Sequence, residues 1–340
     1  MKNKRIQWYL LALVPQSVPA FAIASPLQED HVQQVRECLL SEKPHGGWVL
    51  VDGDILVPPI QMSNFTTNLW SGGVIRYFFE ASVGTANRQR MRSAMDRWET
   101  EANLVFVESD AHSLEHIHVI DSNNDPDCDG NHSGVGAPII YTGGATGYEV
   151  CIQDWTVPGI LWHELGHTLG YWHEQSRTDR DSYVQVNLTN VCQDCCEGTS
   201  CNHNFEIRPE SLAYGPYDFD SIMHYDDLTF SDNGLPTITV LTPNEGQQDH
   251  IGQQDHLSFW DSRTMSFLYP ESNWRFVDRN FSGTQSGTFL NPYRILSSGI
   301  SAVPTAGKIW MQPGNYANTG LFTKAMTWAA PLGGVVIGRP

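Results

Sequence analysis

The sequence has few basic residues and few long apolar runs. Among its 340 residues, 20 are Lys or Arg and 38 are Asp or Glu, which gives a formal net charge of −18. This excess of negative charge argues against a nucleic-acid partner, because binding to phosphates depends on basic side chains, and it favours solubility. Beyond the first 24 residues no apolar run is long enough to cross a bilayer, so we expect no membrane span.

The apolar run that the sequence does contain lies near its beginning. Three basic residues precede the apolar segment 8–14, and two small-x-small sites follow within residues 20–24. This pattern is typical of a secretory signal peptide and is too short for a membrane anchor. We therefore expect residues 1–24 to be a signal peptide cleaved near Ala22 or Ala24, and the protein to be secreted into the extracellular space.

The most informative stretch places two histidines and a glutamate on one predicted helix. Segment 157–172 is apolar enough to be a buried helix, and His163 and His167 are four residues apart within it. Positions i and i+4 lie on the same helix face, so both imidazoles can share one metal ion. Glu164 stands beside these ligands, where it can reach a metal-bound water.

A glycine and a third histidine complete this pattern. Gly170 can take positive φ and end the helix, which lets His173 return to the metal. Three neutral histidines leave one zinc position open, as catalytic sites require, and no fourth strong ligand for a closed structural site is evident nearby. Zinc lowers the pKa of bound water to about 7, so Glu164 can take its proton, and the resulting hydroxide can attack a carbonyl polarised by the same metal.

The residues around this stretch resemble one family. The extended motif resembles that of the metzincin metalloproteases, and its continuation at 174–184 resembles the astacin family specifically. The segment S-I-M-H-Y at 221–225 resembles that family's Met-turn, residues 69–75 resemble the start of its mature domain, and segments within 251–269 resemble its end. The resemblance covers roughly residues 61–270 and implies a secreted zinc endopeptidase that acts on proteins or peptides.

The resemblance also implies a role for each site residue. Glu164 would be the general base and then the acid, and Met223 would form the hydrophobic floor under the metal. Tyr225 would be a further, weak zinc ligand that swings away to stabilise the oxyanion, where a phenol can donate one hydrogen bond; a buried core tyrosine is the alternative. Glu174 would pair with the new N-terminal ammonium after activation. The implied zinc ligands are the three histidines, His163, His167 and His173.

We expect residues 25–60 to be an inhibitory propeptide. Astacin propeptides carry an F-x-G-D-I motif whose aspartate occupies the open zinc position, and V-D-G-D-I at 51–55 matches it with valine in place of phenylalanine. Asp54 is therefore the candidate latch, so the propeptide would act as the protein's own inhibitor. Cys38 is a competing candidate, because a thiolate is a strong zinc ligand. Activation would cut near residues 60–64.

The sequence has seven cysteines, and disulfides are permitted in a secreted protein. The resemblance implies a disulfide between Cys128 and Cys151, and the family's other disulfide is absent. Cys38 is left as the odd cysteine. Four cysteines in an insertion after residue 184 predict two local disulfides, with a second metal site that includes His203 as the alternative: Cys192, Cys195, Cys196 and Cys201.

One acidic loop resembles the opening of an EF-hand calcium loop. Its three aspartates alternate and a glycine follows, but Gly136 stands where the closing glutamate of such a loop is needed. We therefore expect a solvated acidic loop, with a bound Ca²⁺ as the alternative. The four matching residues are Asp125, Asp127, Asp129 and Gly130.

The resemblance implies an α+β fold of the metzincin type, with two subdomains and a horizontal active-site cleft, and the remaining pattern of strands and helices fits this plan. His116 and His118 alternate with apolar residues, so we expect them to line a strand face rather than to bind metal. The catalytic domain would comprise residues 61–272. Its expected elements are helices at 85–102 and 257–268 and strands at 104–107 and 116–120.

Residues 273–340 form a glycine- and proline-rich segment in which short apolar runs alternate with turns. It resembles the first coil of a right-handed parallel β-helix, as found in secreted carbohydrate-active proteins. Because a solenoid coil needs neighbours to bury its core, this β-rich appendage would pack on the protease, self-associate or bind a surface. The segment could bind carbohydrate, or it could stabilise or sort the protein; its sequence is consistent with each of these roles.

The sequence leaves alternatives open for two properties: the residue preferred after the cut bond and the class of function. Many astacins receive an acidic residue after the cut bond with an arginine in I-G-Q-R, but residues 251–254 read I-G-Q-Q. Gln254 is the S1′ candidate and predicts a neutral or broader preference. The intact ligands and Glu164 favour an active endopeptidase over a non-catalytic protein that binds a surface or carbohydrate on a protease-like scaffold. A zinc enzyme acting on non-peptide bonds is a third class, against which only the astacin-like flanks argue.

Overall fold

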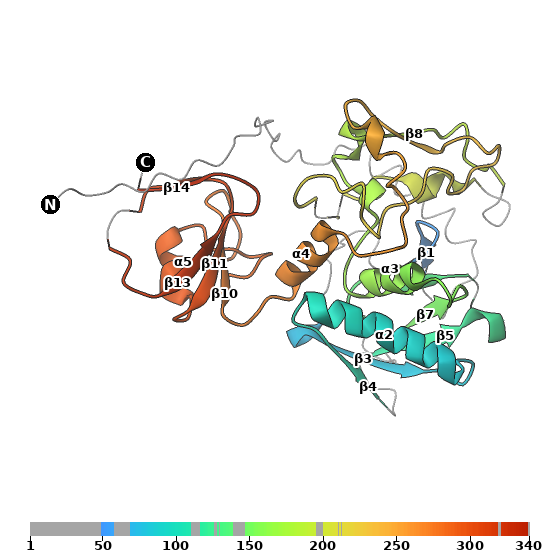
Figure 1. Ribbon diagram of the computed structural model, residues 1–340, viewed down its shortest axis with the longest axis horizontal. Helices are drawn as coiled ribbons and strands as arrows, with labels where there is room; N and C mark the ends of the chain where they lie inside the picture. Colours follow the sequence, from blue (N-terminus) through green and yellow to red (C-terminus); the bar gives the residue numbers. More distant parts are fainter. Residues whose placement is uncertain are drawn as a thin grey trace. The chain divides into compact units, whose positions relative to one another are not determined.

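The computed structural model in Figure 1 describes residues 49–57, 69–109, 116–125, 128, 130–138, 147–194, 200–209, 211, 213–318 and 321–338. The chain divides into two compact units, with the boundary between Glu271 and Ser272. Several predictions fall outside the described residues: the signal peptide at 1–24, the propeptide before residue 49, the activation site at 60–64, Cys38, Asp127, Asp129, Cys195 and Cys196.

The first unit contains a seven-stranded sheet in the order β1-β2-β6-β7-β5-β3-β4. Strands β4, β3, β5 and β7 are parallel, while β6 runs antiparallel to β7, and β2 runs parallel to β6. The strands are β1 (Val49–Val51), β2 (Ile55–Val57), β3 (Val74–Phe79), β4 (Val105–Glu108), β5 (His116–Asp121), β6 (His132–Gly134) and β7 (Gly147–Ile152).

Two helices, α2 (Thr85–Glu101) and α3 (Pro158–Thr168), contact each other beside this sheet (Figure 1). Helix α2 buries Met91, Met95 and Trp98, which recur at the spacing of one helical face. These side chains pack with apolar residues of β3, β5 and β7 and of α3 into one core. The core therefore fixes α3, the helix with the two spaced histidines, against the sheet.

The expected elements of this unit are confirmed, with small shifts at their ends. The two predicted strands are β4 and β5, and the predicted helix at 85–102 is α2. The closing helix α4 (Phe259–Leu268) begins two residues later than expected, because Ser258 and Asp261 form a reciprocal capping box at its start. Helix α3 ends at Thr168, since Gly170 takes φ 113° just beyond it.

Between α3 and α4 the described residues are mostly irregular, with short 3-10 turns and the antiparallel pair of β8 (Val184–Val186) with β9 (Ile238–Val240). Apolar residues of this half, including Phe205, Tyr217 and Tyr225, form a second core cluster. Regular strands and helices thus precede an irregular half, and the predicted α+β class is confirmed.

The second unit pairs its strands in parallel. Its two small sheets have the orders β10-β11-β13 and β12-β14. Its own small core contains Val277, Leu296, Ile309 and Met311. The resemblance to a β-helix coil stays a prediction. The elements are β10 (Trp274–Val277), α5 (Leu296–Ala302), β11 (Gly307–Met311), β12 (Gly314–Tyr316), β13 (Met326–Ala329) and β14 (Val335–Ile337). In the described part of the chain, no helix has the length and hydrophobicity needed to cross a membrane.

Candidate metal centre

Helix α3 presents two histidines from one face. Pro158 occupies its first turn, where a missing backbone N–H costs nothing, and Leu161 and Leu165 are buried in the core. His163 and His167 are one turn apart, and their Nε2 atoms lie 3.0 Å from each other. The helical spacing predicted from the sequence therefore does bring these two imidazoles together.

The end of α3 is held by side chains from distant parts of the chain. The indole Nε1–H of Trp70 donates to the carbonyl of Thr168 at 2.8 Å, and the hydroxyl of Tyr269 donates to the carbonyl of Leu169 at 3.0 Å. These donors satisfy carbonyl groups that a helix end leaves without intrahelical partners. The histidine-bearing turn is therefore fixed at its C-terminal end.

A tight turn after α3 returns the chain to the same point. Gly170 takes φ 113°, a conformation that L side chains rarely adopt, and the N–H of Tyr171 donates to the carbonyl of Gly166 at 2.9 Å. The following extended residues place His173 with its Nε2 atom 3.2 Å from that of His163. The structure thus brings the three predicted ligands together.

Backbone carbonyls orient two of the three rings. The Nδ1–H of His163 donates to the carbonyl of Ile222 at 2.8 Å, and the Nδ1–H of His167 donates to the carbonyl of Tyr171 at 2.8 Å. A hydrogen bond at Nδ1 fixes the tautomer in which Nε2 carries a lone pair. Both rings therefore present an electron pair to the point where His173 also arrives.

This donor set fits one zinc ion. In a tetrahedral site with Zn–N bonds of about 2.05 Å, neighbouring nitrogens are separated by about 3.3 Å. The Nε2 separations of 3.0 and 3.2 Å among the three histidines are close to that value. Lone pairs that face one another at such distances repel each other unless a cation lies between them. The grouping of metal-binding side chains also includes Asp54.

Asp54 reaches the histidines from the turn between β1 and β2. Its Oδ2 lies 3.3 Å from Nε2 of His163, and its Oδ1 lies 3.1 Å from Nε2 of His173. With no metal bound, imidazoles that carry a proton on Nε2 act on this carboxyl: burial opposes its ionisation, but the charge of His173 and the hydrogen bonds from His163 and His173 outweigh it and hold the pKa of Asp54 well below its usual range. Asp54 is therefore an ionised carboxylate at the point where the imidazoles converge.

Glu164 lies beside the three histidines and is 2% exposed. Among the described residues, no hydrogen-bond partner meets its Oε2 atom. Burial raises the pKa of Glu164 well above the ordinary value, the negative charge of Asp54 raises it further, and the charge of His163 opposes both. A buried carboxyl with a raised pKa and an unengaged oxygen is suited to accept and later return a proton.

Met223 lies directly under α3. A Cβ atom built on Gly166 would lie 2.6 Å from the Met223 sulfur, so glycine is the residue that fits there. The Met223 carbonyl also accepts a hydrogen bond from the N–H of Glu174 at 3.0 Å. The Met-turn therefore contacts the helix closely at Gly166, through the Met223 sulfur.

Tyr225 packs its ring 4.5 Å from that of His173, measured between centroids. Its hydroxyl donates to the backbone carbonyl of Asp52, in the same turn that carries Asp54. Burial raises the pKa of Tyr225 well above its ordinary value, and the charges of Asp54 and Asp52 add to this effect. The phenol is therefore a proton donor at this site, while its part as a zinc ligand stays a prediction.

Glu174 is a half-buried carboxyl, 16% exposed, rather than one on the open surface. Its Oε1 accepts hydrogen bonds from Arg177 at 3.0 Å and from the N–H of Asp218 at 2.8 Å. Burial raises the pKa of Glu174 to about 8, against the charge of Arg177. Pairing of Glu174 with a new N-terminus stays a prediction.

Gln254 is exposed, and its backbone packs against the first turn of α3 at Gly159, where a Cβ atom would lie 2.2 Å from the Gln254 carbonyl oxygen. This contact places residue 254 near the helix that bears the histidines. The role of its side chain in substrate selection stays a prediction.

Sequence reasoning did not find Asp261, which orients the site from α4. Its carboxylate accepts hydrogen bonds from Ser221 at 2.7 Å and from the N–H of Ile222 at 2.9 Å, and the Ile222 carbonyl holds His163. The Asp261 carbonyl accepts from the hydroxyl of Tyr171 at 2.6 Å. The Ser-x-x-Asp capping box was the available signal for this residue, although it does not identify the distant partners.

Sequence reasoning also missed the partner of Asp52. The carboxylate of Asp52 is fully buried and forms an ion pair with Arg208, whose Nε atom lies 2.9 Å from Oδ2 and whose Nη2 atom contacts Oδ1. The two residues are 156 positions apart, so no local pattern connects them.

The predicted disulfide between Cys128 and Cys151 is confirmed. Cys192 and Cys201 are also disulfide-bonded. Because a disulfide sulfur offers no thiolate to a metal, the alternative metal site on these cysteines is not supported. The ring of His203, expected as a ligand there, instead pairs its Nδ1 with the carbonyl of Ser200 at 2.9 Å.

His116 and His118 lie on β5 as expected, with their Nε2 atoms 2.6 Å apart, and His118 Nδ1 lies 3.1 Å from a carboxylate oxygen of Glu80. Of the acidic loop, Asp125 is described and its carbonyl accepts from the N–H of Cys128 at 3.3 Å. The structure does not test the calcium alternative.

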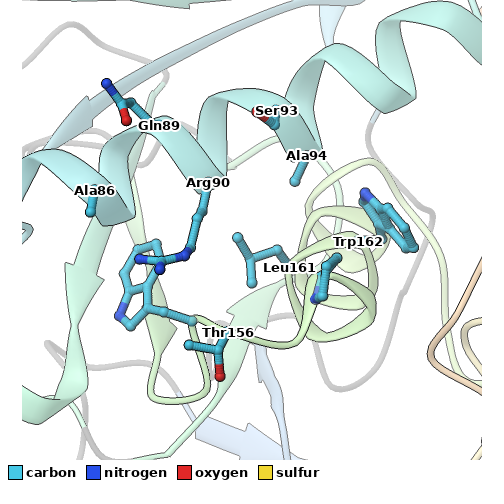
Figure 2. A pocket seen from close by; sticks show the side chains of 10 residues that line it. Ala86, Gln89, Arg90, Ser93, Ala94, Thr156, Leu161 and Trp162 are labelled. Atoms are coloured by element: carbon cyan, nitrogen blue, oxygen red, sulfur yellow. The ribbon is translucent and has the colours of Figure 1, made fainter.

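A separate cavity of about 500 Å³ lies between α2 and α3 (Figure 2). Arg90 and Gln89 come from α2, and Leu161 and Trp162 come from α3. Arg90 already donates to Asn87 at 2.7 Å. The lining of this cavity contains none of the three histidines, so we place the chemistry of the protein at the metal centre.

The chain is similar to known proteins over much of its length. A family model described as Astacin (Peptidase family M12A) matches residues 62–270. Zinc metalloproteinase nas-14 of Caenorhabditis elegans is 32% identical over 213 residues, which are 62% of this chain and 39% of that protein. The astacin-like metalloendopeptidase of Mus musculus is 29% identical over 296 residues, which are 83% of this chain and 61% of that protein.

The chain therefore spans between 39% and 61% of the length of these two curated relatives. Among solved structures, high choriolytic enzyme 1, a hatching-enzyme zinc protease of the medaka fish Oryzias latipes, is 28% identical with a TM-score of 0.49. That match covers 61% of this chain and 94% of the other.

Proposed function

Because the chain belongs to the astacin family of peptidases, we propose that it is a secreted zinc endopeptidase that hydrolyses peptide bonds in proteins or peptides. One observation carries the proposal: the Nε2 atoms of His163, His167 and His173 converge beside the buried carboxyl of Glu164. A non-catalytic scaffold would have no need of an unengaged buried carboxyl at that point. The surface- or carbohydrate-binding alternative is therefore not favoured.

The three histidines would hold the zinc ion, which when bound would polarise the scissile carbonyl and acidify a water molecule. Glu164 takes one proton from the attacking water as the new C–O bond forms. It then delivers this proton to the leaving nitrogen when the C–N bond breaks. The hydroxyl of Tyr225 donates to the oxyanion, once the Asp52 carbonyl that it now contacts has left.

Replacement of Glu164 tests this proposal. The Glu164→Gln variant keeps the shape of the side chain and loses the base, so we expect kcat on casein or gelatin to fall by roughly 10²–10⁴-fold. Bound zinc, measured by atomic absorption, should stay near one ion per chain because Glu164 is not a ligand. Equal inactivity of wild type and variant, with zinc bound to both, would contradict the proposal and favour the binding scaffold.

We further propose that the chain is made as a latent zymogen in which Asp54 covers the metal. Support comes from the contacts of the Asp54 carboxylate with His163 and His173, and from strand β2, whose Ile55 and Leu56 are buried beside β6. Cys38, the competing latch, lies outside the described residues. The proposed segments are a signal peptide at 1–24, a propeptide at 25–60, a catalytic domain at 61–272 and a β-rich appendage at 273–340.

The latch is tested by comparing Asp54→Ala with Cys38→Ala in the uncleaved chain. We expect Asp54→Ala to raise peptidase activity before activation, and Cys38→Ala to leave it at the latent level. The reverse result would assign the latch to Cys38. The mass and N-terminal sequence of the form recovered from the medium would locate the signal and activation cuts and show whether residues 273–340 are retained.

A further inference from the structure

The turn that carries Asp54 contains a second carboxylate with a partner of its own. The side chain of Asp52 is fully buried, and Nε and Nη2 of Arg208 contact its two oxygens separately, the Nε contact at 2.9 Å. A two-point contact of this kind matches the planar guanidinium to a carboxylate and is stronger than a single bond. Arg208 is thus built to receive a carboxylate at this point of the fold.

The position of Arg208 is fixed by its backbone. Its N–H donates to the carbonyl of Ser176 at 2.8 Å, in the 3-10 turn that follows His173. The residue also follows the short turn η5 (Cys201–Phe205), and the ring of Phe205 packs 5.9 Å from that of Tyr225. Arg208 therefore belongs to the same wall as the tyrosine beside the metal centre.

Residue 52 is held at two points of this wall. Arg208 binds its carboxylate, and the hydroxyl of Tyr225 binds its carbonyl. Two residues further on, Asp54 meets the histidines. Residues 52–54 form a turn, with φ 51° at Asp52 and 80° at Gly53, so they lie closer together than residues two apart in an extended chain, which are separated by about 6.6 Å. A peptide that places its scissile carbonyl at the metal would thus pass Arg208 within one or two residues of that bond.

Building on the proposed peptidase function, we propose that Arg208 is the carboxylate-binding residue of the substrate cleft, and that Asp52 occupies its place in the latent chain. When segment 49–57 departs, a substrate aspartate or glutamate takes over the contact with the guanidinium. An acidic preference then arises at Arg208, although Gln254 supplies no charge for one.

Matched peptides test this inference on the activated enzyme. Pairs would differ only by Asp against Asn, placed in turn at the positions within two residues of the cut bond. We expect wild type to prefer Asp at one of these positions by more than tenfold in kcat/KM, and Arg208→Gln to bring that ratio close to one. Arg208→Lys should keep part of the preference, because it keeps the charge but not the planar fork.

A second arginine serves as a control for long-range charge. Arg97 lies on α2 and pairs with Glu101 at the helix surface. Arg97→Gln removes the same charge and should leave the Asp-to-Asn ratio unchanged. Thermal unfolding of each variant shows whether it is folded. A wild-type ratio near one at every position, or a ratio unchanged in folded Arg208→Gln, overturns the inference.

A binding measurement separates this inference from the proposed function. A fluorescent peptide with the sequence of residues 49–57 would be titrated into Glu164→Ala protein from which the N-terminal segment has been cut, together with its Asp52→Asn copy. We expect the Asp peptide to bind more than tenfold tighter, and Arg208→Gln to remove the difference. If this discrimination is found but the activated wild type hydrolyses no peptide, the peptidase proposal is refuted and the site is kept. Hydrolysis without discrimination in either measurement would refute the site alone.

Discussion

At the scale of single residues, the metal centre depends on groups that leave no room for substitution. Gly166 is surrounded by its own helix and by the Met223 sulfur, which would lie 2.6 Å from any Cβ atom placed there. The absence of one side chain on α3 therefore lets the Met-turn approach the helix closely. We therefore expect substitution of Gly166 to affect stability and zinc binding, although glycine has no side chain that could take part in the reaction.

We expect Gly166→Ala to destabilise the protein by about 1–3 kcal/mol, the usual cost of overpacking, and to weaken zinc binding. The matched control is Gly246→Ala, because a Cβ atom added at Gly246 would meet nothing within 4 Å and its φ is not positive. Chemical unfolding and zinc content would be compared in both variants. Equal effects of the two substitutions would show that the contact with Met223 is unimportant.

Tyr225 gives the second prediction at this scale. Its hydroxyl is a buried donor whose present acceptor, the Asp52 carbonyl, belongs to the segment expected to leave on activation. We expect Tyr225→Phe to lower kcat of the activated enzyme by roughly 10²–10³-fold, the effect of losing one oxyanion donor, with a smaller change in KM. Steady-state kinetics on one peptide would check this. A change confined to KM would assign the hydroxyl to substrate binding instead.

At the scale of elements, the first turn of α4 holds the Met-turn in place. Asp261 caps its own helix through Ser258 and also binds Ser221 and Ile222 of the Met-turn. The Ile222 carbonyl in turn orients His163. One carboxylate therefore ties a helix terminus, a turn and a metal-facing imidazole together.

We expect Asp261→Ala to lower zinc affinity by roughly 10- to 100-fold, as loss of a group that orients a metal ligand usually does. Competition with a chelator would measure it. Asp255→Ala is the control, because Asp255 is exposed and precedes the same helix. An unchanged affinity in a folded Asp261→Ala protein would show that His163 keeps its orientation without the Met-turn contact.

Asp218, whose carboxylate accepts a hydrogen bond from Ser258 at the start of α4, predicts that the stability of the protein depends on pH. Burial raises the pKa of Asp218 from 3.8 to about 6, and the charge of Asp261 adds to this. A folded pKa above the unfolded one means that the native state binds the proton more tightly, so the stabilisation is present below pH 3.8 and is lost as pH rises through about 6.

The stability of wild type relative to Asp218→Asn should therefore fall as pH rises from about 4 to about 6.5, since Asn does not titrate. Unfolding midpoints in guanidinium across this range would measure the difference. A difference that is constant or that grows with pH would contradict the assignment.

At the scale of the whole molecule, the two units have separate cores, so a chain that ends at Glu271 should fold and keep the proposed peptidase activity. Expression of this shorter chain, followed by activation and a casein assay, would check the expectation. Loss of folding would show that residues 272–340 stabilise the catalytic unit. Loss of activity in a folded chain would assign them a part in substrate handling.

The part of the site that the sequence predicts consists of residues on one helix and in the turn that follows it. The spacing of His163 and His167 and the glycine at 170 follow from helical geometry alone. The turn at Gly170 also placed His173 at the metal, and the flanking motifs supplied the resemblance that added Tyr225 and Met223 to the site. Both kinds of signal lie in short, contiguous stretches of sequence.

The contacts that were missed join segments far apart in the chain. Trp70 reaches Thr168 across 98 positions, and Asp52 reaches Arg208 across 156. Neither side chain carries a local periodicity that names its partner, because the pairing depends on how the sheet and the irregular half pack. Asp261 is intermediate: its capping box is visible in the sequence, whereas its bonds to the Met-turn depend on the tertiary fold.

The pairing of β2 with β6 has one more consequence. Ile55 pairs with Ser133 and Leu56 with Gly134, so the N-terminal hairpin covers the backbone of β6 beside the histidines. Its departure would turn β6 into an edge strand with unpaired amide and carbonyl groups. Such an edge binds any extended chain through the main chain, whatever its side chains. In the proposed zymogen, activation should therefore also make the cleaved chain more prone to pair with another copy of itself than the uncleaved chain, until substrate fills that edge.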